Sequence, residues 1–326
     1  MAFASGGAGF IQANWNSDVY STSDHETAIG FHRADLTRKP ELDIVRPMVA
    51  FLKEARSHLI DRKPEDVCMV IPHSAMFPAT PATKMCVRLM SYRLGVPMRA
   101  VGEYALENLG KPRLILLPSP GMLSQGAWEA LIRAVEAGST MLVTGPIDWD
   151  ERRQPIERLS KLGIEAATQP VAGEEEAIIF GSEYRLVFGD DKIGHVEKAV
   201  LGGVGGTVRT EQIGAGKLVY SALPVELADN IEPAIALYQF ALKQAVLQPP
   251  FSIEKPEPGV LIRPLFFKDA ILYSLVSETD ADRELSFTDN ATGKALKVNV
   301  PAQRAVMFLL GRDGKLLAQY GGCVES

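Results

Sequence analysis

The chain has 326 residues, of which 46% are hydrophobic and 23% are charged, and its formal net charge is −6. This composition predicts a folded protein with two or three cores, and the negative charge argues against nucleic acid or an anionic membrane as the main partner, because both require a concentrated basic surface. No apolar run reaches the roughly 20 residues of a membrane span, and the three cysteines lie too far apart for a zinc motif or a disulfide framework. We therefore expect a cytoplasmic protein without a bound metal or cofactor.

The first predicted segment covers residues 1–62. It opens with an apolar stretch from Gly6 to Asn16, which contains GAGFIQANWN, and continues through the polar loop STSDHETAIGFHRADLTRKP. A helix follows from near Pro40, and Pro47 should kink or divide it. We interpret the apolar stretch as a buried strand of a parallel sheet. Such a strand needs partners on both sides, so the segment is predicted to be the last strand-helix unit of an incomplete TIM barrel.

The second predicted domain, residues 63–250, alternates strands with helices. The apolar runs VCMVI, VPMRAV, RLILLPS and TMLVTG are the predicted strands. Between them we expect one helix from about Pro81 to Leu94, capped by Thr80, and another from about Gln125 to Ala137, capped by Ser124. The alternation predicts an α/β fold, in which a parallel sheet carries helices on both faces.

The remainder of the chain is richer in strands. Short β-type runs between residues 164 and 222, including AIIFG, YRLVFG and KLVYSAL, predict an antiparallel insertion or edge. Asn230 is the predicted cap of a helix that Pro249 and Pro250 terminate. Residues 251–326 contain five or six alternating or apolar runs joined by polar turns, and they predict a third domain, a small antiparallel β-sandwich.

The order of these parts resembles a known family. Together with the run LILLPSPGMLSQGAWEALIRAVEAGSTMLVTGP, it is similar to the C-terminal portion of a bacterial β-galactosidase of the glycoside hydrolase 42 type, or of a related TIM-barrel glycosidase. The resemblance implies that the middle domain has a flavodoxin or class I amidotransferase-like fold, mediates trimer formation and rims a neighbour's active site. It also implies a retaining mechanism that uses two glutamates on the fourth and seventh barrel strands.

The catalytic pair is expected to be absent from this chain. Retaining hydrolysis needs two carboxylates about 5 to 5.5 Å apart, and in the family they precede the eighth barrel strand, where this sequence begins. We therefore predict no catalytic residues and no activity for the isolated chain, which would be a part or a subunit of a glycosidase. The alternative is a non-catalytic oligomerisation or carbohydrate-binding protein. Both interpretations predict a homo-oligomer, with a trimer favoured.

The N-terminal segment supplies the candidate binding site. An aromatic residue at the carboxyl end of a barrel strand can stack on a sugar ring, and neighbouring polar side chains can bond its hydroxyls. The alternatives are that the tryptophan plugs the barrel mouth and that the polar side chains hold the loop, or that His25, His32 and Asp24 bind a metal without any recognised ligand spacing. The candidate substrate-binding residues are Trp15, Asn16, Asp18, His25, Glu26, His32 and Arg33.

The middle domain offers no nucleophile of the amidotransferase kind. Active members of that fold place a cysteine on a sharp turn after a strand, but the turns at 117–121 and 143–146 contain none. Cys68 and Cys86 fall inside a predicted strand and a predicted helix, where thiols are usually inert. His73 and Ser74 are interpreted as a turn, and the glycine-rich LGGVGG and GAGKL lack the spacing of phosphate-binding loops.

Overall fold

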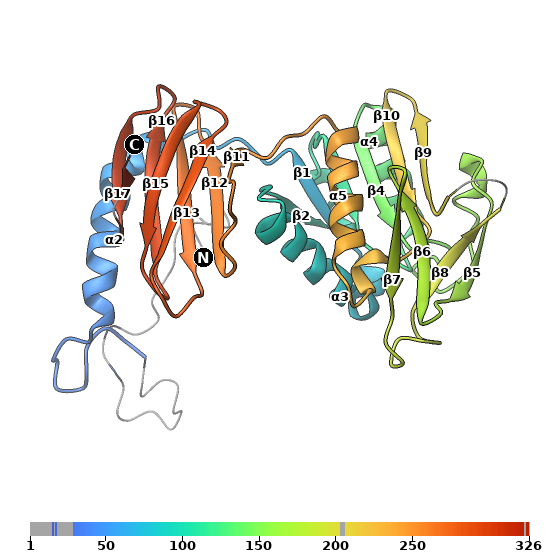
Figure 1. Cartoon of the computed structure of the whole chain (residues 1–326), viewed down its shortest axis with the longest axis horizontal. Helices are drawn as coiled ribbons and strands as arrows, with labels where there is room; N and C mark the ends of the chain where they lie inside the picture. The colour runs from blue at the N-terminus through green and yellow to red at the C-terminus, as the bar shows by residue number, and fades with distance from the viewer. Residues whose placement is uncertain (1–14, 16, 18–28, 203–205, 323, 326) are drawn as a thin grey trace. The chain divides into compact units, whose positions relative to one another are not determined.

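The computed structural model describes residues 15, 17, 29–202, 206–322, 324 and 325. The predicted strand from Gly6 to Asn16, apart from Trp15, lies outside these residues. The chain forms two compact units (Figure 1). One, here called the α/β unit, is Pro64–Pro249; the other, the β unit, joins the N-terminal segment up to Lys63 with Pro250–Ser326.

A parallel sheet forms the centre of the α/β unit, as predicted. Its strand order is β2-β1-β3-β4-β10-β9, and all neighbours are parallel except β9, which pairs antiparallel with β10 at the edge. The apolar runs that form β1, β3, β4 and β10 are buried almost throughout, as expected for strands covered on both faces. The strands are β1 (Val67–Ile71), β2 (Arg99–Gly102), β3 (Leu114–Leu117), β4 (Thr140–Thr144), β9 (Val208–Ile213) and β10 (Gly216–Ser221).

The run KLVYSAL corrects one expectation. We predicted it to belong to an antiparallel insertion or edge, but it forms β10, which lies parallel to β4 inside the sheet. Its residues Leu218–Ser221 are all buried, and burial on both faces is typical of an internal parallel strand. The insertion itself is present as two antiparallel pairs, β5 (Ala166–Pro170) with β8 (Glu197–Leu201) and β6 (Glu174–Ile179) with β7 (Ser182–Val187).

Helices cover both faces of the sheet, as predicted. On one face, α3 (Met76–Arg88), its π-helical extension Leu89–Arg93 and α5 (Glu232–Gln244) contribute to a core that includes Leu116 and Val219. On the other face, α4 (Gln125–Glu136) packs its buried stripe against alternate residues of the same strands. Short 3-10 turns occur at Arg56–His58, His73–Ala75, Glu103–Asn108, Ser160–Leu162 and Val225–Leu227.

The predicted helix caps had mixed outcomes. Ser124 caps α4 as expected, because its Oγ accepts a hydrogen bond from the Ala127 N–H at 3.4 Å. Thr80 is not the N-cap of α3, since the helix already begins at Met76 and contains Pro81 in its interior. The proline that signals a helix start therefore follows the actual start. This shows how a sequence signal can mark the right helix and the wrong boundary.

Asn230 is also not a cap. The residue before α5 is Ile231, which makes no side-chain cap. Instead, Asn230 Oδ1 accepts the Val187 N–H at 2.9 Å, and its Nδ2 donates to the Arg185 carbonyl at 2.7 Å. The Asn230 amide therefore connects strand β7 to the start of α5. It bonds the backbone of this edge strand instead of the backbone N–H groups of the helix.

The β unit contains two antiparallel four-stranded sheets that enclose a shared apolar core, with more strands than the five or six predicted. Helix α2 (Glu41–Ala55) covers the outer face of the second sheet, where Phe51 and Ala55 pack against Leu265 and Leu309. Pro47 lies inside α2 without dividing it. The first sheet contains β11 (Phe251–Ser252), β14 (Arg283–Asp289), β15 (Lys294–Val300) and β18 (Val324–Glu325); the second contains β12 (Val260–Phe266), β13 (Ala270–Ser277), β16 (Ala305–Gly311) and β17 (Leu316–Tyr320).

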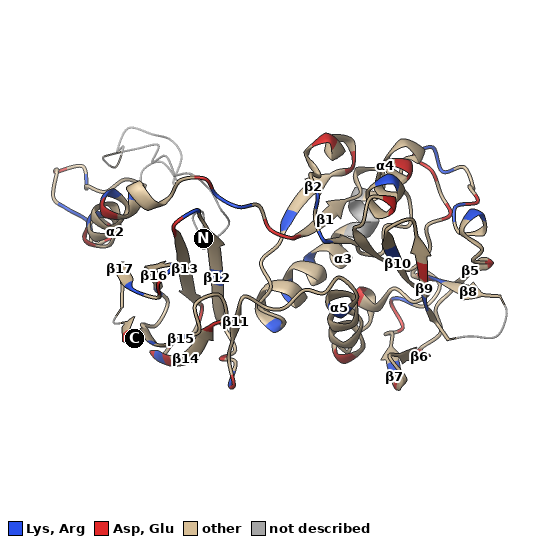
Figure 2. Ribbon diagram, turned by 90° about the horizontal axis from the view of Figure 1, so that it is seen from above, with Lys and Arg blue, Asp and Glu red and all other residues tan. Residues whose placement is uncertain are grey.

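Charged residues of both signs are interspersed along the helices and loops (Figure 2). This distribution accompanies a formal net charge of −6 over the whole sequence. Within the described residues, none of the helices has the length and apolarity needed to cross a bilayer.

Candidate functional site

The N-terminal segment brings Trp15 and His32 together. The Trp15 carbonyl accepts the backbone N–H of Phe31 at 2.8 Å and of His32 at 3.1 Å, and the Ser17 N–H returns to the His32 carbonyl at 2.9 Å. The indole ring lies 5.7 Å from the ring of Phe31, almost perpendicular to it, and 5.2 Å from the imidazole. Phe31 is buried, whereas Trp15 is 60% exposed. The segment thus exposes the Trp15 ring to solvent, while the buried Phe31 ring packs against it.

Arg33, a further predicted site residue, is engaged with its own loop. Its Nη1 donates to the Arg38 carbonyl at 2.7 Å and to Thr37 Oγ1 at 3.4 Å. Asp35 Oδ1 accepts the Thr37 hydroxyl at 2.6 Å and its N–H at 3.0 Å, and these bonds lower the pKa of Asp35. These bonds close the loop from Arg33 to Arg38 on itself. The other candidate residues of the substrate site, and Asp24 of the alternative metal site, lie outside the described residues: Asn16, Asp18, Asp24, His25 and Glu26.

A first polar cluster lies at the carboxyl ends of β1 and β2. The buried carboxylate of Glu103 accepts the Ser74 N–H at 2.8 Å, the Ser74 hydroxyl at 2.7 Å and the Ser124 N–H at 2.5 Å. The Ser74 Oγ also lies 3.0 Å from the hydroxyl of Tyr104, and the ring of Tyr104 stacks with that of His73 at 6.1 Å between centroids. Glu103 therefore joins the ends of two strands to the start of α4.

Sequence reasoning treated His73 and Ser74 as a turn, and they do form a 3-10 turn. It missed Glu103, which is separated from Ser74 by 29 residues. The sequence offered one local signal, a glycine, Gly102, directly before Glu103. In the structure Gly102 ends β2, and a Cβ at this position would lie only 2.7 Å from Nε2 of His73. A glycine directly before a buried acidic residue at a strand end marks such a close approach.

A second cluster surrounds the fully buried Glu226. Its Oε2 accepts the hydroxyls of Ser119 at 2.9 Å and Thr144 at 2.7 Å, while its Oε1 accepts the Tyr238 hydroxyl at 2.6 Å. Burial raises the pKa of Glu226, and the hydrogen bonds from Tyr238, Thr144 and Ser119 oppose that rise. The carboxyl group links the ends of β3 and β4 to α5.

Ser119 occupies the turn that a nucleophile would use. Its φ of +39° is unusual for a residue other than glycine. However, α4 begins only at Gln125, whereas the elbow that exposes a nucleophile leads directly into a helix. Among the described contacts, the Ser119 hydroxyl meets Thr144 and Glu226 and no histidine. The geometry therefore supports a structural hydroxyl rather than an activated one.

The two described cysteines are buried thiols. Desolvation raises the pKa of Cys68 to about 11, and it also raises the pKa of Cys86, which lies wholly inside the core. Because only the thiolate is a strong nucleophile, neither side chain is activated at neutral pH. In the described part of the chain, His, Cys, Asp and Glu side chains form no group of three that could hold a metal ion.

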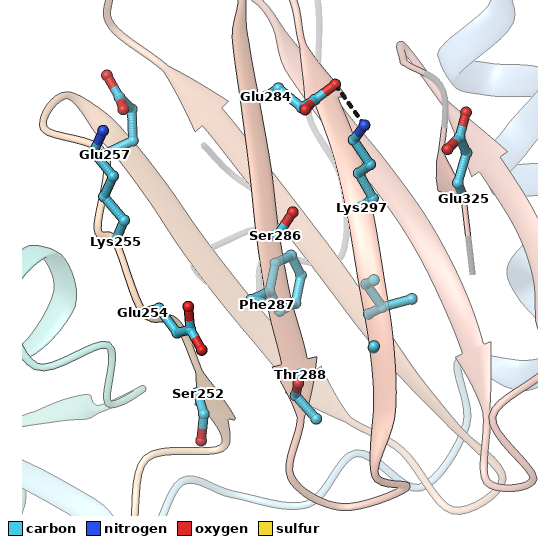
Figure 3. Close-up of a pocket in the computed structure, with 12 residues that line it drawn as sticks. Ser252, Glu254, Lys255, Glu257, Glu284, Ser286, Phe287, Thr288, Lys297 and Glu325 are labelled. Carbon is cyan, nitrogen blue, oxygen red and sulfur yellow. Dashed lines mark ion pairs between the residues drawn. The ribbon is translucent and has the colours of Figure 1, made fainter.

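The β unit carries an open groove of about 720 Å³ on its first sheet (Figure 3). Its walls include Glu254, Glu257, Glu284 and Lys297. Lys297 Nζ pairs with Glu284 at 3.0 Å, and Glu257 pairs with Arg283 at 2.9 Å. Two of the carboxylates that line this groove are therefore paired with neighbouring cations, and exposed ion pairs of this kind contribute little to stability.

Comparison with known proteins places the fold. No family model matches the chain, and no curated protein sequence matches it. Several solved structures do match. A GH42 β-galactosidase from G. stearothermophilus, solved as a catalytic mutant, superposes with a TM-score of 0.68 at 13% identity, covering 92% of this chain and 48% of that one.

Two further β-galactosidases match similarly. The enzyme from Bacillus circulans sp. alkalophilus gives a TM-score of 0.66 at 13% identity, over 89% of this chain and 48% of its own. The cold-adapted enzyme from Rahnella sp. R3 gives 0.62 at 16% identity, over 91% and 48%. The chain thus spans about half the length of these structures. The predicted resemblance to the C-terminal portion of a GH42 enzyme is confirmed at the level of the fold.

Proposed function

We propose that this chain is the C-terminal part, or a subunit, of a retaining glycoside hydrolase that acts on β-galactosides, with its two catalytic glutamates outside these 326 residues. The observation that carries the proposal is the fold likeness to several GH42 β-galactosidases, of which the chain covers 48%. Within the chain, the buried carboxylates of Glu103, Glu226 and Asp289 already accept hydrogen bonds from neighbouring side chains. They are therefore poorly suited to act as an acid or a nucleophile.

In this proposal, the N-terminal segment lines the sugar site. The exposed ring of Trp15 would stack on the sugar, since aromatic faces provide contact area at small entropic cost. The hydrogen bonds that Arg33 makes within its own loop favour a positioning role for it. The remaining residues proposed to contact substrate are Asn16, Asp18, His25, Glu26 and His32.

We further propose that the α/β unit is an amidotransferase-like domain that has no glutaminase activity and mediates trimer formation. Its parallel sheet with helices on both faces supports the amidotransferase-like fold. Its buried, protonated thiols support the absence of glutaminase activity. The trimer follows from the resemblance to GH42 enzymes. Light scattering on the purified chain should then give about three times the chain mass of 35.5 kDa.

The catalytic assignment predicts that the isolated chain does not hydrolyse 4-nitrophenyl β-galactoside above the rate of an enzyme-free control. Adding a barrel polypeptide with two strand-end glutamates should produce turnover, because retaining hydrolysis needs that pair. Turnover by the chain alone would refute the claim that the catalytic pair lies elsewhere. Sugar binding without turnover in any combination would support the second candidate, a non-catalytic carbohydrate-binding protein, which the exposed Trp15 ring also suits.

The binding assignment predicts that Trp15→Ala weakens lactose binding about tenfold, as expected for losing roughly 1.4 kcal/mol of stacking. Trp15→Phe should retain most of the affinity, because a ring remains. Phe180→Ala is the matched control, since Phe180 is 64% exposed in the α/β unit. Calorimetric titration of the four proteins measures the difference, and equal affinities for wild type and Trp15→Ala would contradict the assignment.

A further inference from the structure

Two exposed apolar residues of the α/β unit adopt a backbone conformation that disfavours them. Phe180 has a φ of +53° and the next residue, Gly181, a φ of +81°. The two form the turn of the β6–β7 hairpin, where positive φ angles favour Asn, Asp or Gly. Val246 has a φ of +55° and follows the C-cap of α5, at the position that is most often glycine. A bulky or β-branched residue with such a φ is an outlier.

Both residues lie next to Lys243, near the C-terminal end of α5. The Lys243 ammonium is 4.3 Å from the centroid of the Phe180 ring, and the Lys243 carbonyl accepts the Val246 N–H at 3.0 Å. Phe180 is 64% exposed and Val246 is 75% exposed, so packing within the chain offsets little of their strain. Strained residues of this kind concentrate at functional sites. Phe180, Lys243 and Val246 are here called the α5 end.

The β6–β7 hairpin carries an acidic hollow of about 390 Å³ on its other face. Alternate residues of β6 point into the core that α5 shares, whereas Glu176 and Ile178 are exposed on the opposite face. Glu183 lies across from Ile178 on β7 and also lines the hollow. Arg185 in its wall is paired with Glu174. Within the described part of the chain, the carboxylates of Glu176 and Glu183 form no ion pair, and neither does Lys243.

We propose that the α5 end of one copy of this chain docks into the acidic hollow of a second copy. The two surfaces match in charge, because Lys243 offers an unpaired cation to the unpaired carboxylates of Glu176 and Glu183. They also match in polarity, since the exposed Phe180 ring can cover Ile178, which is 50% exposed in the hollow. Both halves of the contact belong to the same chain, which is why the occupant is a second copy.

The contact is head to tail. Helix α5 packs on one face of the β6–β7 hairpin (Figure 1), and the hollow lies on the other, so the two surfaces of one copy are directed toward different neighbours. Contacts between unlike surfaces generate a closed ring when the rotation between neighbours closes. The number of copies in the ring rests on the proposed trimer, whereas the position of the contact does not.

Charge reversal tests the contact in the full chain. Light scattering over a range of concentrations gives the mass and the dissociation constant of the assembly. Lys243→Glu should weaken association at least about tenfold, because like charges then face each other. The pair Glu176→Lys and Glu183→Lys should have the same effect, and combining all three substitutions should restore association. Arg133→Glu on α4, which covers the other face of the sheet, is the matched control and should change nothing.

A second variant separates loss of the contact from misfolding. Phe180→Asn should weaken association about tenfold, although asparagine suits this turn better than phenylalanine does. Its thermal unfolding midpoint should therefore stay close to that of the wild type. Sugar binding through Trp15 belongs to the other unit and should be unchanged in all of these variants.

Each outcome decides between the contact and the trimer. A trimer that survives both Lys243→Glu and Phe180→Asn would overturn the contact and leave the proposed trimer intact. A wild-type chain that is monomeric at every concentration would refute both. An assembly of another size that these variants dissociate would support the contact and refute the trimer. Dissociation that the combined charge reversal does not restore would refute the pairing of the α5 end with the hollow.

Discussion

Replacing Arg158 by alanine is expected to destabilise the α/β unit by about 3 to 5 kcal/mol. The side chain is only 1% exposed. Its Nη1 donates to the carbonyls of Ile147 at 2.9 Å and Trp149 at 3.0 Å, and its Nη2 donates to that of Leu123. Removing the guanidinium leaves all three carbonyls without this donor, and unsatisfied buried polar groups cost far more than a hydrogen bond normally contributes.

The same geometry predicts that Arg158→Lys does not restore stability. Three carbonyls converge on a planar fork, whereas an ammonium group is a compact point charge on a flexible stem. Desolvation also lowers the pKa of Arg158, and a buried lysine responds far more strongly to desolvation. Urea unfolding measures the free energies, and Arg133→Ala, on the exposed face of α4, is the control. A loss below about 1 kcal/mol for Arg158→Ala would contradict this account.

The second large effect concerns Glu226. Glu226→Ala should cost about 2 to 4 kcal/mol, because the hydroxyls of Ser119, Thr144 and Tyr238 lose their shared acceptor inside the core. Glu226→Gln keeps an amide oxygen for Tyr238 and a comparable volume. It should therefore be much milder than the alanine variant, and its effect should depend on pH.

The direction of that dependence follows from the raised pKa of the buried Glu226. A glutamate in the unfolded chain ionises at about pH 4.3. Above that pH the folded state retains a proton that the unfolded state has lost, so the free energy of unfolding falls as pH rises toward the folded-state pKa. Glutamine cannot ionise, so Glu226→Gln should remove this fall and gain stability relative to wild type as pH rises.

Urea unfolding at several pH values between 4.5 and 8.5 tests this prediction. The control is Glu129→Gln, since Glu129 lies on the exposed side of α4 and should alter neither stability nor its pH dependence appreciably. If wild type and Glu226→Gln show the same pH dependence, the pKa of the Glu226 carboxyl group is not raised in the folded state.

Much of the fold was predictable because it depends on local signals. Continuous apolar runs are typical of strands covered on both faces, and they located β1 to β4. Ser124 was recognised as a cap from its position before an amphipathic stripe. Errors arose where tertiary contacts outweighed those signals. Asn230 bonds a strand instead of capping a helix, and α3 starts at Met76, before the proline that was expected to mark its first turn.

The candidate sites divide in the same way. Trp15 was selected as an aromatic residue at the end of a predicted strand and His32 as a polar residue of the loop after it, and the structure brings their rings together. The clusters around Glu103 and Glu226 were missed because their members are far apart in sequence, 29 residues for Ser74 and Glu103 and 107 for Ser119 and Glu226. A parallel sheet gathers distant strand ends at one edge, and no local pattern records which polar residues meet there.

The sequence by itself determined the alternation of strands and helices between residues 67 and 144, the strand-rich C-terminal part, the resemblance to GH42 enzymes and the absence of a cysteine from the turns that could expose one. These properties depend on residue type and spacing. Only the tertiary structure decided that α2 covers the sheet of the β unit, that β10 enters the parallel sheet, and that Glu103 is bonded to both Ser74 and Ser124. The reason is physical: burial and hydrogen bonding join residues that are remote in the chain, and those pairings are selected by the folded state as a whole.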